Sequence, residues 1–415
     1  MRRLDAPKGW AQPLLTPPAA PWAALRAAVA LGPVGTIAAL EQAGLRGRGG
    51  AGFPTADKWR AVAATGAATR YAVAHGYESD PAVFSNRLLM EQNPQAVVEG
   101  LAIAALSVGA REAFIAVRAE NVDAIRALQG VIDAGERDGA LGGDAAGSGR
   151  EVSIAIRPLQ GSSMIGEETV LLKALAGKRG QPEQTPPYPA TSGYLGKPTA
   201  VNNVATLAAA TWILNDGAGA FAQIGDPAQP GTALVQLAGA VARAGVLEVP
   251  TGTTLADIIA AAGGTAGGAQ PKALLVGGPT GGFVPASLLA ATPYSGAGLD
   301  AVGAHIGSGA ILVLDAAADI PELAALVTRW CADEACGKTI PCRIGTRRLA
   351  EIGQRFVDGL AGPADAQRLQ ALAADVADSA LCDHERLAPR PLITGMRYFE
   401  REFLPAASTT ANGRS

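Results

Sequence analysis

The sequence is poor in aromatic residues and carries no excess of charge of either sign. Aromatic residues make up 5% of the 415 positions, whereas apolar residues make up 48%, many of them alanine. The formal net charge is −3, and basic and acidic residues are dispersed along the chain. The absence of a strongly charged block argues against nucleic acid or an anionic membrane as a binding partner. A chain of this length holds about two to three domains with a substantial core.

The sequence also lacks a long uninterrupted hydrophobic run. The amino-terminal residues MRRLDAPKGW are followed by no apolar segment, which argues against a secretory signal. The most apolar stretches are interrupted by Glu99, Gly100 and Arg111, or by Asn202 and Asn203. None therefore reaches the roughly 18 apolar residues that a membrane-spanning helix requires. We expect a cytoplasmic protein with no direct membrane span.

Cysteine is scarce and confined to the last quarter of the chain. The four cysteines are Cys331, Cys336, Cys342 and Cys382. In a reducing cytoplasm disulfides are rare, so clustered cysteines favour a metal or redox role. The alternative is that they are buried structural thiols.

The order of apolar patterns predicts an α/β domain in the first half of the chain. Strand-like segments at 70–77, 112–120 and 151–159 alternate with helix-like segments at 93–110 and 121–135, the second of them capped by Asn121. Strand–helix–strand alternation is typical of a largely parallel sheet.

Composition predicts five parts along the chain. A Pro- and Ala-rich irregular arm, expected to lie against a neighbour, precedes the α/β domain. A strand–turn–strand–helix pattern then predicts a small ubiquitin-like β-grasp domain, and a helical bundle surrounds the cysteines. The predicted bounds are 1–35 for the arm, 36–227 for the α/β domain, 228–300 for the β-grasp domain, 301–405 for the bundle and 406–415 for a disordered tail.

The segment GLRGRGGAGFPTADKW contains the spacing G-x-G-x-x-G over residues 47–52. A dinucleotide-binding fingerprint requires a preceding strand, but here a helix precedes the glycines and Pro54 follows them, so that interpretation fails. Consecutive glycines still let backbone N–H groups approach a phosphate, and Arg46, Arg48 and Lys58 add positive charge. The segment predicts a phosphate-type site, with an ordinary glycine-rich turn as the alternative.

The same segment resembles the signature of the flavin-binding, NADH-oxidising subunit of respiratory complex I. The diaphorase (beta) subunits of NAD-linked formate dehydrogenases and hydrogenases carry the same signature. The resemblance spans roughly residues 36–400 and continues in order through YESDPAVFSNRLLMEQNPQAVVEG, GEETVLLKALAGKRGQP, PPYPATSGYLGKPTAVNNVATL, GSGAILVLD and CGKTIPCRIGTRR. It implies a Rossmann-like FMN/NADH-binding domain, a β-grasp domain and a helical bundle that binds a [4Fe–4S] cluster.

The resemblance also implies roles for individual residues. The sequence matches five features of the family: the glycines around the FMN phosphate, a lysine that contacts the flavin, an aromatic residue on the adenine of NADH, an acidic pair beside flavin and nicotinamide, and an asparagine pair. The implied cofactor-binding residues are Gly47, Gly49, Gly50, Phe53, Lys58, His75, Glu78, Asp80, Glu167, Glu168, Tyr188, Asn202 and Asn203. Glu168 is the predicted catalytic residue. As alternatives, Glu167 and Glu168 are helix-start acids, and Asn202 caps the helix that follows it.

Several positions depart from the family pattern around the flavin ring and the NADH pocket. The departures are His75 for Asn, Tyr77 for Asp, Asp80 for Glu, Ser163 for an aromatic, Thr185 for Lys and Ala205 for Glu. The phosphate-binding glycines are retained, so flavin binding is expected. Direct use of NAD(H) is open, because the missing lysine removes a charge partner of an anionic dinucleotide.

The cysteine segment departs from the family pattern SCGxCTPCR at one ligand. Cys336, Cys342 and Cys382 stand at ligand positions, whereas Thr339 replaces a thiolate. Cubane clusters normally use four thiolates, which are soft donors suited to iron. Four possibilities stay open: a [4Fe–4S] cluster with an oxygen ligand or an open site, a [3Fe–4S] cluster, completion of the site by another residue such as Cys331 or His384, and a loop without a cluster.

The predicted function is a flavin and iron–sulfur subunit of a multisubunit oxidoreductase that moves electrons between NAD(H), FMN and iron–sulfur clusters. The expected partners are a thioredoxin-like [2Fe–2S] subunit and a catalytic metal subunit of the formate dehydrogenase or hydrogenase type. The alternatives are a flavin subunit that serves another carrier, and a non-catalytic scaffold.

Overall fold

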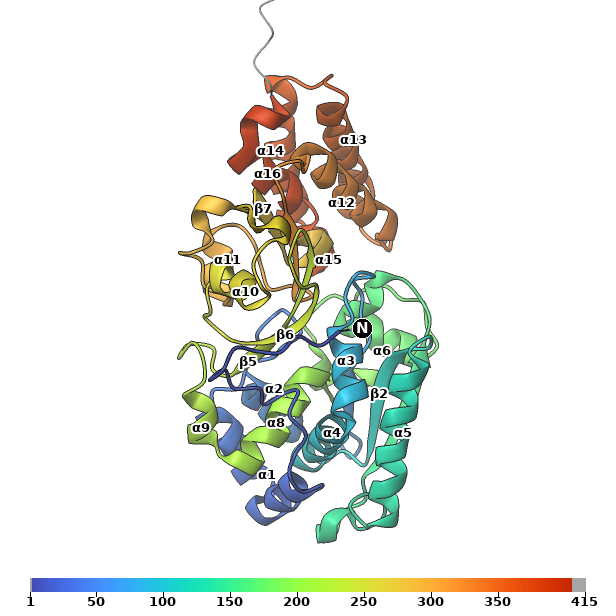
Figure 1. Cartoon of the computed structure of the whole chain (residues 1–415). Coiled ribbons are helices and arrows are strands. Elements are labelled where there is room, and N and C mark those ends of the chain that lie inside the picture. The colour runs from blue at the N-terminus through green and yellow to red at the C-terminus, as the bar shows by residue number, and fades with distance from the viewer. Residues whose placement is uncertain (1, 405–415) are drawn as a thin grey trace, which may run out of the picture.

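The computed structural model describes residues 2–404; residues 1 and 405–415, which include the predicted disordered tail 406–415, lie outside the described part. Figure 1 shows three units in succession, from a blue-to-green α/β unit at the lower end, through a yellow unit, to an orange and red helical unit at the upper end. This order confirms the predicted fold class.

The first unit is built on a four-stranded parallel sheet in the order β3-β2-β1-β4. The strands are β1 (Tyr71–His75), β2 (Glu112–Arg118), β3 (Ser153–Leu159) and β4 (Thr199–Asn203). Helices α1 (Ala23–Gln42), α2 (Thr55–Ala63), α3 (Ser85–Gln92), α4 (Pro94–Val108), α5 (Val122–Arg137), α6 (Glu168–Leu175), α7 (Pro189–Ser192), α8 (Val204–Asp216) and α9 (Ala218–Ala222) accompany it. Both faces of β1 are buried, as expected for a parallel sheet covered by helices.

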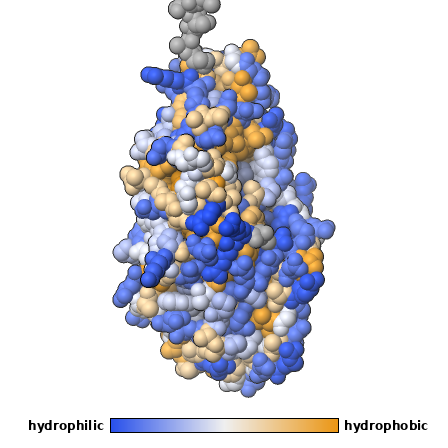
Figure 2. Space-filling model, viewed as in Figure 1, coloured by the Kyte–Doolittle hydropathy of each residue, from blue (hydrophilic) through white to orange (hydrophobic). Residues whose placement is uncertain are grey.

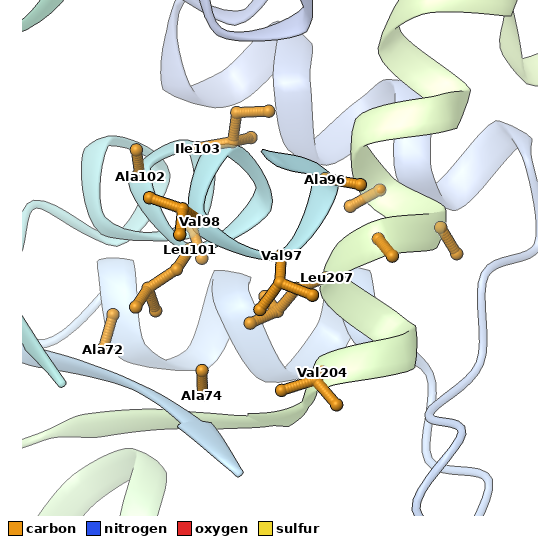
Figure 3. Close-up of a cluster of buried hydrophobic side chains, with 14 of the residues drawn as sticks. Ala72, Ala74, Ala96, Val97, Val98, Leu101, Ala102, Ile103, Val204 and Leu207 are labelled. Atoms are coloured by element: carbon orange, nitrogen blue, oxygen red, sulfur yellow. The ribbon is translucent and has the colours of Figure 1, made fainter. Parts of the chain in front are cut away.

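The core of this unit lies between α4, α8 and the sheet (Figure 3). Asn93 starts α4 by accepting a hydrogen bond from the backbone N–H of Ala96, and Gly109 ends it with a positive φ. Gly100 lets the two helices approach closely, because a Cβ there would lie 2.2 Å from the carbonyl oxygen of Leu207. Asn121 does precede α5, but its side chain makes no capping hydrogen bond.

The predicted irregular arm is too long, because α1 begins at Ala23 rather than after residue 35. Gly32, with a φ of 70° and a ψ of 171°, is not helical, so α1 consists of two helical segments joined at Gly32 and Pro33. By length and composition alone α1 could cross a membrane, and its residues Leu25 and Leu40 are buried in the core of the α/β unit.

The second unit is a five-stranded mixed sheet in the order β6-β5-β9-β7-β8. Its elements are β5 (Thr232–Gly239), β6 (Gly245–Pro250), α10 (Leu255–Ala261), β7 (Ala273–Val276), β8 (Gly282–Pro285), α11 (Gly296–Ala301) and β9 (Ala310–Leu314). The sheet continues past residue 300, where the sequence placed the end of the β-grasp domain, because β9 pairs with both β5 and β7.

The amino-terminal residues pack against this sheet. Arg3 forms a parallel bridge with Val246, and the carboxylate of Glu248 accepts hydrogen bonds from the backbone N–H groups of Leu14 and Leu15 at 2.9 Å each. The arm therefore lies on its own chain.

The third unit is helical and packs against one face of the second sheet, where Leu275, Phe283 and Leu314 join its core. Its helices are α12 (Ile320–Glu334), α13 (Thr346–Val357), α14 (Pro363–Asp378), α15 (Asp383–Leu387) and α16 (Arg390–Phe403). The π-helical turn Pro341–Gly345, which carries Cys342, connects the α12 region to α13. On the face seen in Figure 2, hydrophilic residues predominate, and hydrophobic residues form small groups, several of them over this upper part.

Candidate functional site

A cavity of about 690 Å³ lies where the three units meet. Its floor is formed by the carboxyl ends of β1 and β4, where His75 and Asn203 are register partners. This is the edge at which open parallel sheets bind ligands. Every predicted cofactor-binding residue lines this cavity: Gly47, Gly49, Gly50, Phe53, Lys58, His75, Glu78, Asp80, Glu167, Glu168, Tyr188, Asn202 and Asn203. Their contacts with a cofactor stay predictions.

The glycine segment forms a closed loop in the cavity wall. Arg46 and Pro54 form an antiparallel bridge at its base, and the side chain of Arg46 donates a hydrogen bond to the carbonyl oxygen of Gly52. Within residues 2–404, the backbone N–H groups of residues 49–53 donate no hydrogen bond to another protein group. Successive free N–H groups in a concave loop are an anion-binding arrangement. The amino termini of α2 and α8 lie beside this loop and favour the same charge.

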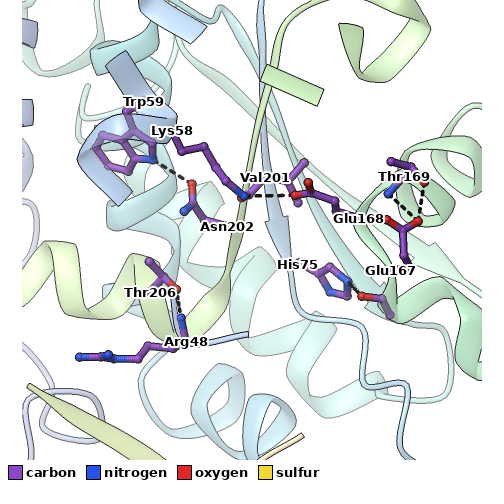
Figure 4. Close-up of polar contacts among 11 residues, drawn as sticks. Arg48, Lys58, Trp59, His75, Glu167, Glu168, Thr169, Val201, Asn202 and Thr206 are labelled. Atoms are coloured by element: carbon purple, nitrogen blue, oxygen red, sulfur yellow. Dashed lines mark hydrogen bonds and ion pairs between the residues drawn. The ribbon is translucent and has the colours of Figure 1, made fainter. Parts of the chain in front are cut away.

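Lys58, on α2, connects the loop side of the cavity to the acidic side (Figure 4). Its Nζ lies 3.1 Å from Oε2 of Glu168 and 3.0 Å from the carbonyl oxygen of Val201. The neighbouring Trp59 donates its indole N–H to Oδ1 of Asn202 at 2.8 Å. Asn202 is therefore held by Trp59, and the helix that follows is capped by Asn203.

Glu167 and Glu168 have different local roles. The carboxylate of Glu167 caps α6 by accepting hydrogen bonds from the backbone N–H groups of Thr169 and Val170, at 3.0 and 2.9 Å. The helix-start interpretation is thus right for Glu167, which lines the cavity as well. Burial raises the pKa of its carboxyl. Glu168 begins the helix and points to Lys58, so it is the more available of the two for a ligand.

The chain has three histidines, His75, His305 and His384, and all of them line the cavity. Burial lowers the pKa of each imidazole, that of His305 to about 4, so all three are neutral near pH 7. Nε2 of His75 lies 3.1 Å from the carbonyl oxygen of Gly166 and serves as the donor, which leaves Nδ1 as an acceptor with no protein partner.

Glu78 and Asp80 lie on the segment that follows β1. Burial raises the pKa of Glu78 to about 8, although the backbone N–H groups of Asn86 and Arg87 oppose this effect. Burial also raises the pKa of Asp80, whose Oδ2 accepts a hydrogen bond of 2.9 Å from Ser308 in the second unit. With a pKa of about 8, the carboxyl group of Glu78 is mostly neutral near pH 7 and can donate a hydrogen bond as well as accept one.

The buried polar atoms that lack a partner gather around this cavity. In the described chain seven residues have such side-chain atoms: Arg48, Thr55, His75, Asn121, Ser163, Tyr294 and Thr328. Five of them, all except Asn121 and Thr328, line the cavity. Because buried polar groups in folded proteins almost always have partners, this concentration indicates that a polar ligand completes the site. The free loop N–H groups and the cavity volume fit a flavin mononucleotide.

Three of the predicted iron ligands lie near one another at the upper side of the cavity. Burial, and to a smaller extent the nearby Glu385, Cys382 and Cys336, raise the pKa of the Cys342 thiol to about 12. Cys382 lines the cavity, whereas Cys336 and Cys342 lie behind it. Within residues 2–404 no three His, Cys, Asp or Glu side chains are close enough to hold a single metal ion. Three neighbouring thiols suit a polynuclear cluster, which spaces its ligands more widely.

The residues considered as substitutes for the missing thiolate are engaged elsewhere. Cys331 is buried in α12, and its thiol lies 3.7 Å from the carbonyl oxygen of Pro279. Nε2 of His384 lies 2.8 Å from the carbonyl oxygen of Cys331. The hydroxyl of Thr339 donates to both carboxylate oxygens of Glu385, at 3.0 and 3.1 Å.

The sequence interpretation missed several residues of this region. Asn86, His305 and Ser308 line the cavity, and Glu385 lies beside the cysteines. Asn86 and Ser308 lie in two of the family-like blocks but were not singled out there, whereas no block contains His305 or Glu385. The scarcity of histidine was the one available signal for His305, and an acid three residues after Cys382 was the signal for Glu385.

Comparison with known proteins agrees with this arrangement. The models of the Nuo51 FMN-binding domain, the SLBB domain, and the NADH-ubiquinone oxidoreductase-F iron-sulfur binding region match residues 40–212, 234–284 and 322–406. The chain is 38% identical to the NADP-reducing hydrogenase subunit HndC of Solidesulfovibrio fructosivorans, over 89% of this chain and 76% of that one. It is 34% identical to the F subunit of the NADH-quinone oxidoreductase of Streptomyces coelicolor, over 91% and 84% of the two chains.

Among solved structures, an NAD+-reducing [NiFe]-hydrogenase in its H2-reduced state superimposes with a TM-score of 0.84 at 32% identity. The match covers 95% of this chain and 66% of that one, so the chain spans about two thirds of its structural relative. Sequence, fold and domain order thus agree along nearly the whole chain. The chain belongs to the family that comprises the F subunits of NADH-quinone oxidoreductases and the related hydrogenase subunits, which are oxidoreductase subunits with an FMN-binding domain, an SLBB domain and an iron–sulfur binding region.

Proposed function

We propose that this chain is the flavin and iron–sulfur electron-transfer subunit of a multisubunit oxidoreductase that uses NAD(H). The observation that carries the proposal is the concentration of unpartnered buried polar atoms around one cavity whose wall includes Cys382. A ligand in this cavity lies beside the cysteine cluster. When bound, FMN supplies the conversion between two-electron hydride chemistry and single-electron transfer.

The residues of the cavity divide into a phosphate side and a ring side. On the phosphate side, the free N–H groups of residues 49–53 and the amino terminus of α2 bind an anion. On the ring side, His75 presents the acceptor Nδ1, and Glu78 is protonated near neutral pH and can donate. Glu168, paired with Lys58, orients the substrate next to the ring.

NAD(H) would enter from the open side of the cavity. Phe53 and Tyr188 line the cavity with exposed aromatic rings, which can stack on an adenine or a nicotinamide. Thr185 lies in the same wall and supplies no positive charge. The cavity therefore relies on stacking and on backbone N–H groups more than on ion pairs at this end.

We further propose that the partners are a thioredoxin-like [2Fe–2S] subunit and a catalytic metal subunit of the formate dehydrogenase or hydrogenase type, in the cytoplasm. Ile340 and Ile344, on and next to the cysteine loop, are 67% and 48% exposed. Apolar side chains exposed beside a redox centre fit a protein–protein contact. The four free cysteines fit a reducing compartment.

The test is flavin analysis followed by reduction. The full-length chain should release FMN in a one-to-one ratio when it is denatured, and NADH should bleach the flavin absorbance of the native protein. Arg126→Gln, an exposed helix position, serves as the control and should behave as the wild type. Flavin that NADH fails to bleach would indicate a different electron carrier, and the absence of flavin would indicate a scaffold.

A further inference from the structure

We propose that Glu385 supplies the fourth ligand of the iron–sulfur cluster, so that the cluster is held by Cys336, Cys342, Cys382 and one carboxylate oxygen of Glu385. This inference rests on the proposed function, because it presupposes that the three cysteines hold a cluster. Thr339, which stands where a thiolate is missing, positions the carboxylate and does not bind iron itself.

The hydrogen bonds of Thr339 show why its own oxygen is a poor ligand. Its hydroxyl donates to Oε1 and Oε2 of Glu385 at 3.0 and 3.1 Å, and its oxygen accepts from the backbone N–H of Cys342 at 3.4 Å. To bind iron as an anion, the hydroxyl would have to lose a proton next to a carboxylate, which like-charge repulsion opposes. A neutral hydroxyl is in turn a weak donor to iron.

Glu385 is a buried carboxylate with unusually few partners. Its residue is 1% exposed, and no Lys, Arg or His within residues 2–404 forms an ion pair with it. Its Oε2 accepts from Thr339 and from the backbone N–H of Leu381 at 3.0 Å, whereas Oε1 has only the shared Thr339 hydroxyl. Buried charges are normally paired or bound to a metal, so Oε1 lacks the partner that its burial calls for.

The two carboxylates that are buried as deeply as Glu385, Glu248 and Glu99, do not share this deficit. Glu248 accepts hydrogen bonds from two backbone N–H groups and from the hydroxyl of Thr232. Glu99 accepts from the backbone N–H groups of Trp22 and Leu25 and from Gln95. Both therefore have structural roles at helix or arm termini. Glu385 instead lies near the thiols of Cys342 and Cys382.

The position of Glu385 in the chain brings it to the cysteines. Cys382 immediately precedes α15, and Glu385 is the third residue of that helix, so both side chains start from one turn. The Thr339 contact joins this turn to the loop that holds Cys336 and Cys342. The two segments that carry the cysteines are thus connected through the proposed ligand.

The charge of the ligand set supports the assignment. Three thiolates and one carboxylate carry the same charge as the four thiolates of an ordinary cubane, whereas three thiolates and a neutral threonine carry one negative charge less. The net charge of a cluster and its ligands is one of the terms that set its reduction potential. Because carboxylate is a harder donor than thiolate, we expect the iron bound to Glu385 to be the most easily removed of the four.

The experiment compares the iron content of the full-length protein after anaerobic reconstitution. Wild type should contain four irons per chain, and its Mössbauer spectrum should resolve one iron from the other three, because one ligand is oxygen. Glu385→Gln should contain three irons. The double variant Thr339→Cys with Glu385→Gln should regain the fourth iron, and its four irons should become alike. Glu351→Gln, an exposed carboxylate on α13, is the matched control and should equal the wild type.

The outcomes separate this inference from the proposed function. Four irons in Glu385→Gln, with the distinct iron retained, would mean that another group is the ligand and would overturn the inference. Three irons in the wild type would also overturn it, but would leave a three-iron electron-transfer subunit. No iron in the wild type would contradict the proposed function itself. If Glu385→Gln does not fold, the wild-type Mössbauer spectrum still decides, because four equivalent irons would overturn the inference.

Discussion

Glu78 is the group whose ionisation should most clearly affect the stability of the flavin-free chain. Burial raises its pKa to about 8 from an unfolded value of 4.5. That pKa difference means that ionisation of Glu78 costs about 5 kcal/mol more in the folded protein than in the unfolded chain. Replacing the residue by glutamine removes this ionisation while it keeps an oxygen for the backbone N–H of Asn86, which donates to the carboxylate at 2.7 Å.

The sign follows from proton binding. Below pH 4.5 Glu78 is protonated in both states, and its contribution to stability is fully present. Between pH 4.5 and about 8 only the unfolded state ionises, so the free energy of unfolding falls by about 1.4 kcal/mol per pH unit. Above pH 8 the contribution is lost. Between pH 5.5 and pH 7.5 the free energy of unfolding of the wild type should therefore fall by about 3 kcal/mol relative to that of Glu78→Gln.

The assay is urea unfolding of the flavin-free chains at these two pH values. Fluorescence and circular dichroism both monitor the unfolding, and the two signals should give the same transition. Other titrating groups are common to both proteins, so their effects largely cancel in the difference. Glu136→Gln, at an exposed position on α5, should track the wild type at both pH values. A stability difference between wild type and Glu78→Gln that does not change with pH would refute the reasoning.

Three further predictions concern the loop, the cavity and the arm. Gly50→Ala should destabilise the fold by about 1–3 kcal/mol, because the φ of Gly50 is 108° and the new Cβ would lie 3.1 Å from a backbone oxygen. Gly49→Ala, whose new Cβ would have its nearest contact at 3.4 Å, should change the stability by less than about 0.5 kcal/mol. Equal shifts of the melting temperature in the two variants would contradict this prediction. Lys58→Met should weaken FMN binding about tenfold in a fluorescence titration, because a half-buried charge-assisted contact is lost, and an unchanged dissociation constant would remove Lys58 from the site. Glu248→Gln should speed amide hydrogen exchange in residues 2–16 about tenfold, because an amide group cannot accept all three hydrogen bonds, and unchanged exchange would show that other contacts hold the arm.

The glycine loop and the cavity residues were predictable because they lie in ordered sequence blocks. The segment around residues 47–52 and the pair Glu167 and Glu168 are recognisable from the chain alone, and the structure brings them to one cavity. The start of α1 was not predicted, because the Pro- and Ala-rich composition of residues 1–35 suggested an irregular segment. Alanine-rich sequence favours helix on both sides of the break at Gly32.

Contacts between distant parts of the chain could not be read from local pattern. The extension of the second sheet by β9 depends on pairing with β5, more than 70 residues earlier. His305 reaches the cavity only because the loop before β9 folds over the first unit. The contact of Thr339 with Glu385 crosses 46 positions, and spacing rules for cysteines do not include an acid.

The segment from Leu381 to Arg390 explains how one chain can keep the flavin cavity and the cysteine cluster in a fixed relation. Its first residues serve the cluster side, since the N–H of Leu381 binds Glu385 and Cys382 lies in the cavity wall. Its last residue serves the cavity side, since Nη1 of Arg390 donates to the carbonyl oxygen of Ala304, next to His305. One short segment thus contacts both the cluster side and the cavity side. The loss of one cysteine at Thr339 therefore need not interrupt the route, provided that the carboxylate of Glu385 on the same segment completes the cluster.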